Sequence, residues 1–223
     1  EIKGLGKAKY ILKPGGTLGD LYTNSDLVYN DDGYIEVDKN GNVAVKDDYM
    51  DDIYLGSVFP KYNLAWRNDF NYKGINLGVL FTARIGGICY SATQANMDLY
   101  GVSEASAAAR DAGGVMINGR DMIDAQKWYQ VIGSQSGLPQ YYTYSATNVR
   151  LQELSLGYTL PSKWFRDKMR MTVSFVGRNL WMIYCKAPFD PEAVASTGMN
   201  YQGIDYFMMP SMRNLGFNVK FQF

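Results

Sequence analysis

The chain has 223 residues, with 22 lysines and arginines against 22 aspartates and glutamates, so its formal net charge is zero. This balance provides no basic excess for nucleic acid and no acidic tail. Histidine is absent, which excludes Ser-His and Cys-His catalysis and removes the commonest zinc ligand. We therefore expect neither an enzyme nor a nucleic-acid-binding protein, and we predict no cofactor.

The composition favours many strands joined by turns. The chain contains 18 Tyr, 10 Phe, 4 Trp and 23 Gly, and this aromatic and glycine-rich profile is typical of all-β proteins. No run of about 20 apolar residues is present, so no helix is expected to span a membrane. The two cysteines, Cys89 and Cys185, lie far apart, and the sequence leaves open whether they are bonded.

The first 61 residues contain a turn signal and an acidic region. Asn40-Gly41 predicts a hairpin, because this dipeptide accepts the positive φ values of a tight turn. The acidic residues of this region are Asp31, Asp32, Asp38, Asp47, Asp48, Asp51 and Asp52. Oxygen-rich loops can hold Ca²⁺, although no EF-hand spacing occurs, and solvated turn residues are the alternative.

Five runs alternate between apolar and polar residues with the period of a β-strand: 62–70, 75–85, 154–160, 169–178 and 213–223. In the last run, Leu215, Phe217, Val219, Phe221 and Phe223 fall on one face. A soluble sandwich would turn such a face toward its core, whereas a transmembrane barrel would turn it toward lipid. Each run has about the 9–11 residues that a tilted strand needs to cross a bilayer.

The connections between these runs differ in length, and the difference favours the barrel. Residues 71–74 and 161–168 form short connections, whereas the others are several times longer. Outer-membrane barrels combine short periplasmic turns with long extracellular loops. We therefore predict an extracellular loop region over 1–61 and transmembrane strands over 62–223, with extracellular loops at 87–147 and 181–210. Within the first loop, Ser103 predicts a helix that it caps and that ends near Gly113.

Several ordered motifs resemble the SusC/RagA family of TonB-dependent outer-membrane transporters. They are LGSVFPKYNLAWRNDFNYKG (55–74), VRLQELSLGYTLP (149–161), GRNLW (177–181), DPE (190–192) and the ending NVKFQF. The resemblance implies an all-β chain that forms about five antiparallel strands at the C-terminal end of a large transmembrane β-barrel, in the bacterial outer membrane. We therefore expect the chain to be a piece of a longer protein.

The resemblance also implies partners. They are the remainder of the barrel with its plug, a SusD-like lipoprotein lid, TonB acting through the missing N-terminal part, and the lipid bilayer. The substrate would be an oligosaccharide or a peptide. The alternative from another class is a secreted or surface β-sandwich that binds glycans or acts as an adhesin.

Three sets of residues are candidates for function. For contact with a substrate or partner lid they are Trp128, Tyr129, Tyr141, Tyr142 and Tyr144, with plain loop packing as the alternative. For the barrel lumen they are Arg67, Arg84, Arg170 and Arg178, which would line a substrate path or, as we prefer, pair with carboxylates of the plug. The signal for barrel assembly, which the resemblance implies, would consist of Phe217, Val219, Phe221 and Phe223. No metal ligands are predicted.

Overall fold

The computed structural model describes residues 2–47, 52–166, 168–196, 198 and 201–222. The chain is predominantly β and divides into two compact units. Unit 1 consists of 1–59, 87–145 and 192–208, and unit 2 consists of 60–86, 146–191 and 209–223. None of the helices in the described ranges has the length and apolar character needed to span a bilayer.

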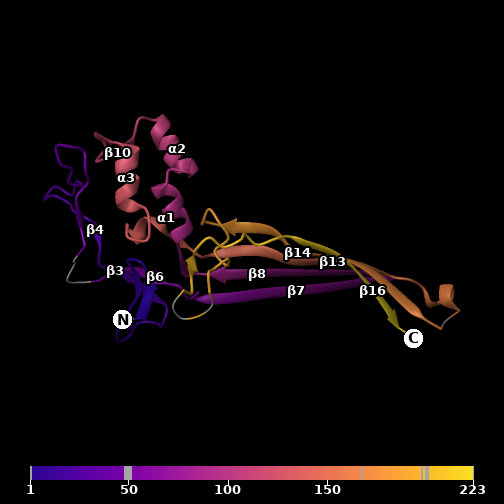
Figure 1. Cartoon of the computed structure of the whole chain (residues 1–223). Coiled ribbons are helices and arrows are strands. Elements are labelled where there is room, and N and C mark those ends of the chain that lie inside the picture. Colours follow the sequence, from indigo (N-terminus) through magenta and orange to yellow (C-terminus); the bar gives the residue numbers. More distant parts are fainter. Residues whose placement is uncertain (1, 48–51, 167, 197, 199–200, 223) are drawn as a thin grey trace. The chain divides into compact units, whose positions relative to one another are not determined.

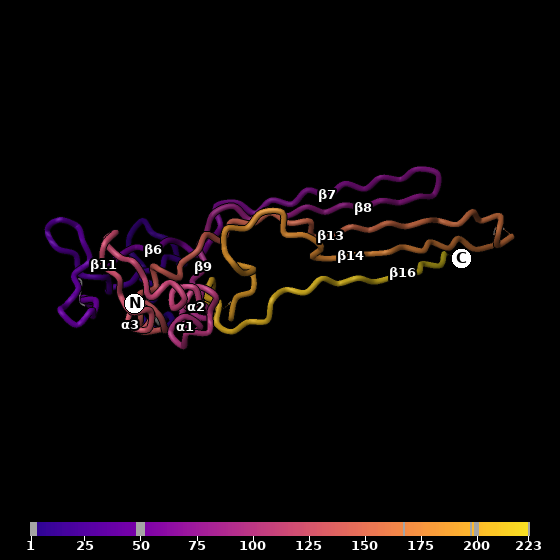
Figure 2. The backbone as a smooth tube through the Cα atoms, turned by 90° about the horizontal axis from the view of Figure 1, so that it is seen from above, coloured from indigo at the N-terminus to yellow at the C-terminus, as the bar shows by residue number. Residues whose placement is uncertain are grey.

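The described part of unit 2 is one antiparallel sheet of five long strands, which lie side by side in Figures 1 and 2. In spatial order they are β16 (Asn214–Gln222), β14 (Arg170–Cys185), β13 (Asn148–Thr159), β8 (Ile75–Ile85) and β7 (Tyr62–Tyr72). A short 3-10 helix, η2 (Ser162–Phe165), lies in the connection from β13 to β14. The five strands predicted from alternation are therefore confirmed.

Two of these strands are longer than predicted. β13 begins at Asn148 rather than Leu154, and β14 continues to Cys185 rather than ending at Arg178. The cause is a bulge, because the register between these strands shifts from Glu153↔Arg178 to Leu151↔Trp181. Asn179 lies in this irregular stretch with φ +52°. In β13 the shift exchanges the two faces, because Leu154 and Leu151 lie on the same face although they are three residues apart, so the apolar period ends there although the strand continues.

The long connections all attach at one end of the sheet. Pairing places Tyr62 opposite Ile85, Arg84 opposite Asn148, and Asn148 opposite Cys185. The two short connections lie at the other end, where Gly74 O accepts a hydrogen bond from Thr159 N at 2.7 Å. The asymmetry inferred from connection lengths is therefore present in the sheet.

In its described residues, unit 1 contains short strands and three α-helices. One sheet has the order β1 (Ile2–Leu5), β2 (Ala8–Tyr10), β3 (Asp20–Thr23) and β6 (Ile53–Ser57), and another has the order β12 (Thr143–Ser145), β9 (Ile88–Ser91) and β15 (Ile204–Asp205). The remaining elements are the pairs β4 (Asp26–Leu27) with β5 (Val45–Lys46) and β10 (Val115–Ile117) with β11 (Asp121–Ile123), the helices α1 (Ala92–Leu99), α2 (Glu104–Asp111) and α3 (Ala125–Ile132), and the 3-10 helix η1 (Pro139–Tyr142).

The segments predicted as a separate loop region and two loops share one core. Leu21 and Leu27 come from the first segment, Tyr90 and Leu138 from the second, and Ile204 from the third, and all five side chains are fully buried. Backbone hydrogen bonds also join the segments, including Lys7 N to Gln135 O and Tyr90 N to Gly203 O. The predicted second loop is shorter than expected, because 181–191 belongs to unit 2.

Two local predictions for unit 1 are confirmed. Gly41 has φ +76° in a turn that is closed by the antiparallel bridge between Val37 and Val43. The Ser103 hydroxyl accepts a hydrogen bond from Ser106 N at 3.0 Å and caps α2. α1 and α3 were not predicted.

Candidate functional site

The candidate site is the long sheet of unit 2, because its two faces differ in chemistry. Opposite residues in antiparallel strands point to the same side of a sheet, so the register shows which side chains share a face. One row crosses all five strands and contains Phe70, Leu77, Leu156, Phe175 and Phe217. The alternating apolar residues predicted for one face therefore do lie on one face.

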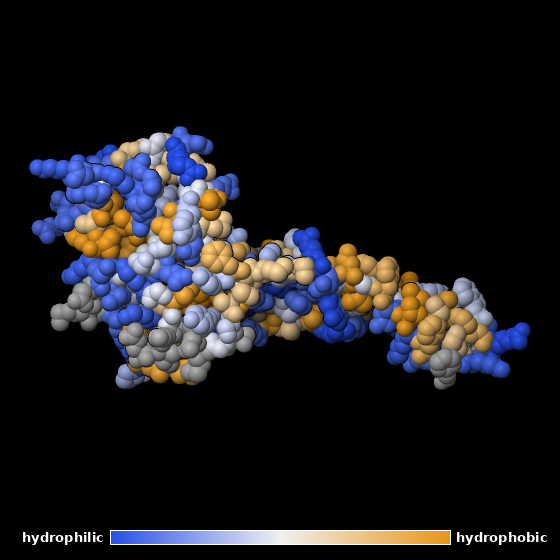
Figure 3. All heavy atoms as spheres, viewed as in Figure 1, coloured by the Kyte–Doolittle hydropathy of each residue, from blue (hydrophilic) through white to orange (hydrophobic). Residues whose placement is uncertain are grey.

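This apolar face is exposed. Trp66 and Leu156 have exposed fractions of 57% and 53%, and Phe217 reaches 81%. Among the described residues, the core cluster contains no side chain of the five long strands. Apolar residues are correspondingly visible on the surface over the long strands in Figure 3. An apolar face of this extent is typical of a surface that contacts lipid or another protein.

Tyr62 and Tyr72 lie at the two ends of β7, and an aromatic row crosses the apolar face between them. Trp66 stacks on Phe81 with 5.7 Å between ring centroids, and the register continues this row through Leu151 to Trp181. Along β7, Tyr62 and Tyr72 are ten residues apart, or about 33 Å at the usual rise of a strand. A tilt of about 40° would reduce this span to about 25 Å, the height of the apolar band of a membrane barrel.

The opposite face carries an ion-pair network. Arg67 Nε lies 2.9 Å from Asp69 Oδ2, and Arg67 Nη1 lies 3.7 Å from Glu153 Oε1. Arg178 Nε lies 2.9 Å from Glu153 Oε2. Two cations and two carboxylates of the same sheet therefore compensate one another. This network gives no support to the preferred expectation that Arg67 and Arg178 pair with carboxylates of a plug.

The other two lumen candidates lie on the same polar face. Arg84 is opposite Asn63 and Asn148, and Arg170 is opposite Gln222. All four arginines therefore share the face that the alternation predicts for them. Their contact with a substrate stays a prediction.

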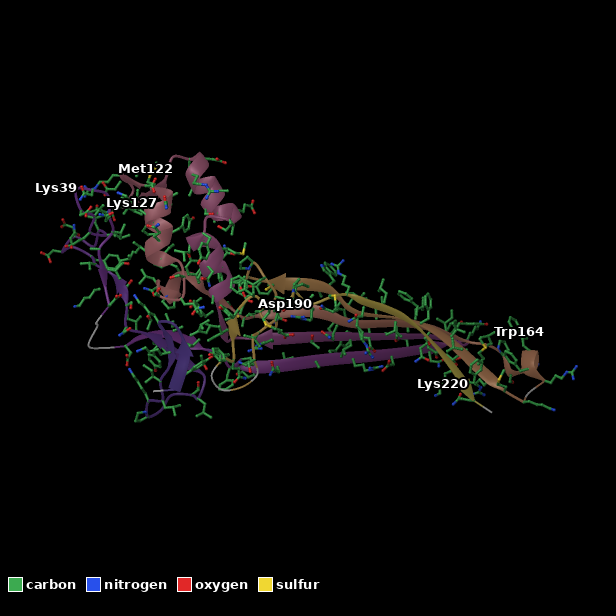
Figure 4. All side chains as sticks on the ribbon, in the orientation of Figure 1. Lys39, Met122, Lys127, Trp164, Asp190 and Lys220 are labelled. Atoms are coloured by element: carbon green, nitrogen blue, oxygen red, sulfur yellow. The ribbon has the colours of Figure 1, made fainter. Side chains whose placement is uncertain are left out.

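A buried ion pair near the attachment of the long connections was not predicted. The Arg150 guanidinium donates to both carboxylate oxygens of Asp190 at 2.9 and 3.3 Å, and both side chains are almost fully buried. Arg150 also donates to Asn179 Oδ1 at 3.3 Å, and Ser211 donates to Asp190. Figure 4 marks Asp190 and, at the opposite end of the sheet, Trp164. The pair joins β13 to the β14–β16 connection, which contains both Asp190 and Ser211.

The aromatic candidates of unit 1 divide by burial. Trp128 and Tyr142 are only 7% and 2% exposed and belong to the core, so for these two the structure favours the packing alternative over contact with a substrate or partner. Tyr141 is 38% exposed and packs edge-on against Trp128. Burial, with nearby Tyr29 and Asp26, raises the pKa of Tyr141 to about 12, so its hydroxyl stays a neutral donor. Tyr129 and Tyr144 are partly buried.

The acidic candidates for calcium make other contacts. Asp38 accepts hydrogen bonds from the backbone of Asn42 and Asn40, and these bonds lower the pKa of its carboxyl. Asp47 pairs with Lys7 Nζ at 2.6 Å. No group of three metal-ligating side chains occurs among the residues with described placement, and Asp48 and Asp51 lie outside them. A calcium site stays a prediction without support from these contacts.

The structure also bears on the two cysteines and on the predicted assembly signal. Cys89 and Cys185 are not joined by a disulfide bond. Phe223, the last residue of the predicted assembly signal, lies outside the described residues, whereas Phe217, Val219 and Phe221 lie on the apolar face of β16.

Comparisons with known proteins agree with the resemblance. No family model matches the chain. It is 25% identical over 198 residues to TonB-dependent receptor P3 of Formosa agariphila, a match that covers 84% of the chain and 19% of the receptor. Its structure is similar to that of the RagAB peptide importer in the open-open state, with a TM-score of 0.51 and 14% identity over 95% of the chain and 23% of the importer chain. The closed-closed state of RagAB gives a TM-score of 0.47 with 16% identity, over 95% of the chain and 24% of the importer chain.

The chain thus spans about a fifth of the length of the receptor and about a quarter of the importer chain. Its resemblance to SusC/RagA-like TonB-dependent transporters is confirmed, and so are the outer-membrane location and the non-enzymatic class predicted with it.

Proposed function

We propose that the chain is the C-terminal wall of a TonB-dependent importer, in which its five long strands complete a transmembrane barrel. The observation that carries the proposal is the exposed apolar row across all five strands, opposite a polar face with its own ion pairs. Lipid would cover the first face and the wet lumen the second. Unpaired backbone groups are costly in lipid, so β7 and β16 would pair with strands of the remaining barrel.

The cargo and the partners complete the proposal. The importer would move oligosaccharides or peptides with energy drawn through TonB, and a SusD-like lipoprotein would close it from outside. The support is the relationship to a TonB-dependent receptor and the likeness to a peptide importer. The folded unit 1, which the long segments of the chain form, would supply the extracellular contacts.

The β-sandwich alternative fits the sheet less well. A sandwich buries one face of each sheet against the other. Unit 2 contains no second sheet among the described strands, and its apolar face stays exposed. A complete protein that remains a folded monomer in water without detergent would favour the alternative and overturn the proposed barrel.

Arginine substitutions on the two faces test the proposal directly. Phe217→Arg and Val173→Arg are each expected to impair membrane assembly by about 2–4 kcal/mol near the bilayer midplane, because the charge would enter lipid. In a water-soluble protein, an arginine at the 81%-exposed Phe217 would change stability little. The measurement is the folded fraction of the complete transporter in outer membranes, scored by gel mobility before and after boiling.

Matched controls lie one residue away. Asn218→Arg and Thr172→Arg should be mild, because both positions lie on the polar face. Equal damage at both pairs of positions would show that both faces are buried in protein and that no barrel wall exists.

Labelling of intact cells tests the orientation. In a Cys89→Ser, Cys185→Ser background, a membrane-impermeant maleimide should react with Val102→Cys, which is 68% exposed in unit 1. It should not react with Lys163→Cys in the short β13–β14 connection, which we place in the periplasm. Reaction at Lys163→Cys alone would invert the proposed orientation.

A further inference from the structure

Asp98 of unit 1 is a buried carboxylate in an unfavourable position. It lies in the last turn of α1 with an exposed fraction of 5%. The C-terminal end of a helix carries partial negative charge, so a carboxylate there is repelled rather than stabilised. Its Oδ1 accepts a hydrogen bond from Gln94 Nε2 at 3.0 Å. Within the described ranges, no lysine or arginine forms an ion pair with it.

The charge of Asp98 acts on three tyrosine hydroxyls, and the Tyr142 hydroxyl is also hydrogen-bonded to it. The pKa values of Tyr129, Tyr142 and Tyr144 are all raised, first by burial of their rings and then by the negative charge of Asp98. A buried charge without an opposite charge is costly unless a ligand compensates it. Asp98 is therefore poised to accept a cation from outside the chain.

A cavity reaches Asp98. It has a volume of about 190 Å³, lies among α1, α2 and α3, and is lined also by Ser106, Arg110, Gln126 and Tyr129. Arg110 Nη1 donates to Gly101 O at 2.8 Å, which holds this exposed guanidinium at the cavity. The lining therefore has one anionic and one cationic side chain, and its neutral polar side chains are Tyr100, Ser106, Gln126 and Tyr129.

The lining suits an organic ammonium better than a metal ion. Ca²⁺ takes six to eight oxygen ligands, whereas this cavity offers a single carboxylate. A primary ammonium needs one counter-ion and hydrogen-bond acceptors, and tyrosine rings attract it further. The volume also exceeds what a bare ion would fill. Arg110 would meet a carbonyl or carboxylate oxygen of the same ligand.

We propose that the α1–α2–α3 cavity binds a primary ammonium group of the transported ligand, with Asp98 as its counter-ion. The group would come from the amino terminus of a peptide or from a lysine side chain. This proposal rests on the proposed function, because it names part of the substrate of the importer.

The test compares ligands on the unmodified protein first. Binding of trialanine amide to the complete purified transporter is measured by calorimetry, beside its N-acetylated form and N-acetyl-Ala-Lys-Ala amide. At least one ligand with a free ammonium should bind about tenfold or more tightly than the acetylated trialanine, and which one binds identifies the source. Equal affinity for all three, or no binding of any, would overturn the inference.

A substitution then assigns the site. Asp98→Asn should weaken the ammonium-bearing ligand about tenfold or more and leave the acetylated form unchanged. Asp111→Asn, an exposed carboxylate of α2, should have no effect and serves as the control. Unchanged binding in Asp98→Asn overturns the inference. If this variant fails to fold, the comparison of the three ligands on the unmodified protein decides whether the inference holds.

The two proposals can fail separately. Membrane insertion is scored on the same preparations by gel mobility before and after boiling. An inserted barrel without ammonium-dependent binding overturns the inference alone. A water-soluble protein that shows such binding overturns the proposed function and retains the cavity as an ammonium site.

Discussion

Replacing Arg150 with methionine is expected to destabilise the folded transporter by about 3–5 kcal/mol, because the buried Asp190 carboxylate would lose the guanidinium that pairs with it. Asp190 is held by both arms of the Arg150 guanidinium and receives a further hydrogen bond from Ser211. Loss of the pair should also loosen the segment before β16, since Asn179 donates to Met212 O at 3.3 Å and is itself bonded to Arg150. The measurement is urea unfolding of the transporter refolded into lipid vesicles.

A second variant separates the charge from the packing. In Arg150→Met with Asp190→Leu, no buried charge remains, and such apolar replacements of buried pairs are often neutral or stabilising. Stability should therefore return most of the way to that of the unmodified protein. If the double variant is as unstable as Arg150→Met alone, the hydrogen bonds to Asn179 and Ser211 rather than the buried charge determine the loss.

The strand faces could be predicted from the sequence because their signal is local. Phe217, Val219 and Phe221 alternate with polar residues, and period 2 requires no knowledge of the partner strand. The same rule failed in β13 before Glu153, since the register shift between Leu151 and Glu153 exchanges the faces of that strand. The additional lengths of β13 and β14 could therefore be recognised only from the pairing of the strands.

The core of unit 1 could not be predicted in the same way. Leu21, Tyr90 and Ile204 meet although they come from three distant segments, and no local pattern signals such packing. Trp128 and Tyr142 look like exposed loop aromatics in the sequence for the same reason. α2 was predicted because Ser103 provides a local cap, and its cap is present in the structure.

The ion pairs could not be predicted from the sequence either, because each depends on residues that the fold brings together. Arg150 and Asp190 are separated by 40 residues and have no spacing that would join them before the fold is known. Glu153 lies just outside the predicted strand 154–160, so its ion pair with Arg178 was missed although the face of Arg178 was predicted. Burial decides the importance of these pairs, because exposed pairs are worth about 0–1 kcal/mol and buried ones several times more when broken.

A single residue inserted after Val219 is expected to prevent most of the transporter from reaching the outer membrane. β16 pairs with β14 through Val219↔Val173 and Phe221↔Met171, with Lys220 on the polar face between them. A one-residue slip exchanges the faces of a strand, so Lys220 would enter lipid and Phe221 would leave it. Together these moves cost about 3–5 kcal/mol. The level of folded barrel in isolated membranes, scored by gel mobility before and after boiling, is the measurement.

Insertion of two residues at the same place is the matched control, because the period of a strand is two and Phe221 would return to the apolar face. This variant should assemble close to the normal level, with the end of β16 displaced along β14 but its faces preserved. The comparison removes the effect of added length and leaves only the alternation. If the one-residue and two-residue insertions assemble equally well, the apolar face of β16 does not contact lipid, and Phe217, Val219 and Phe221 form no part of an assembly signal.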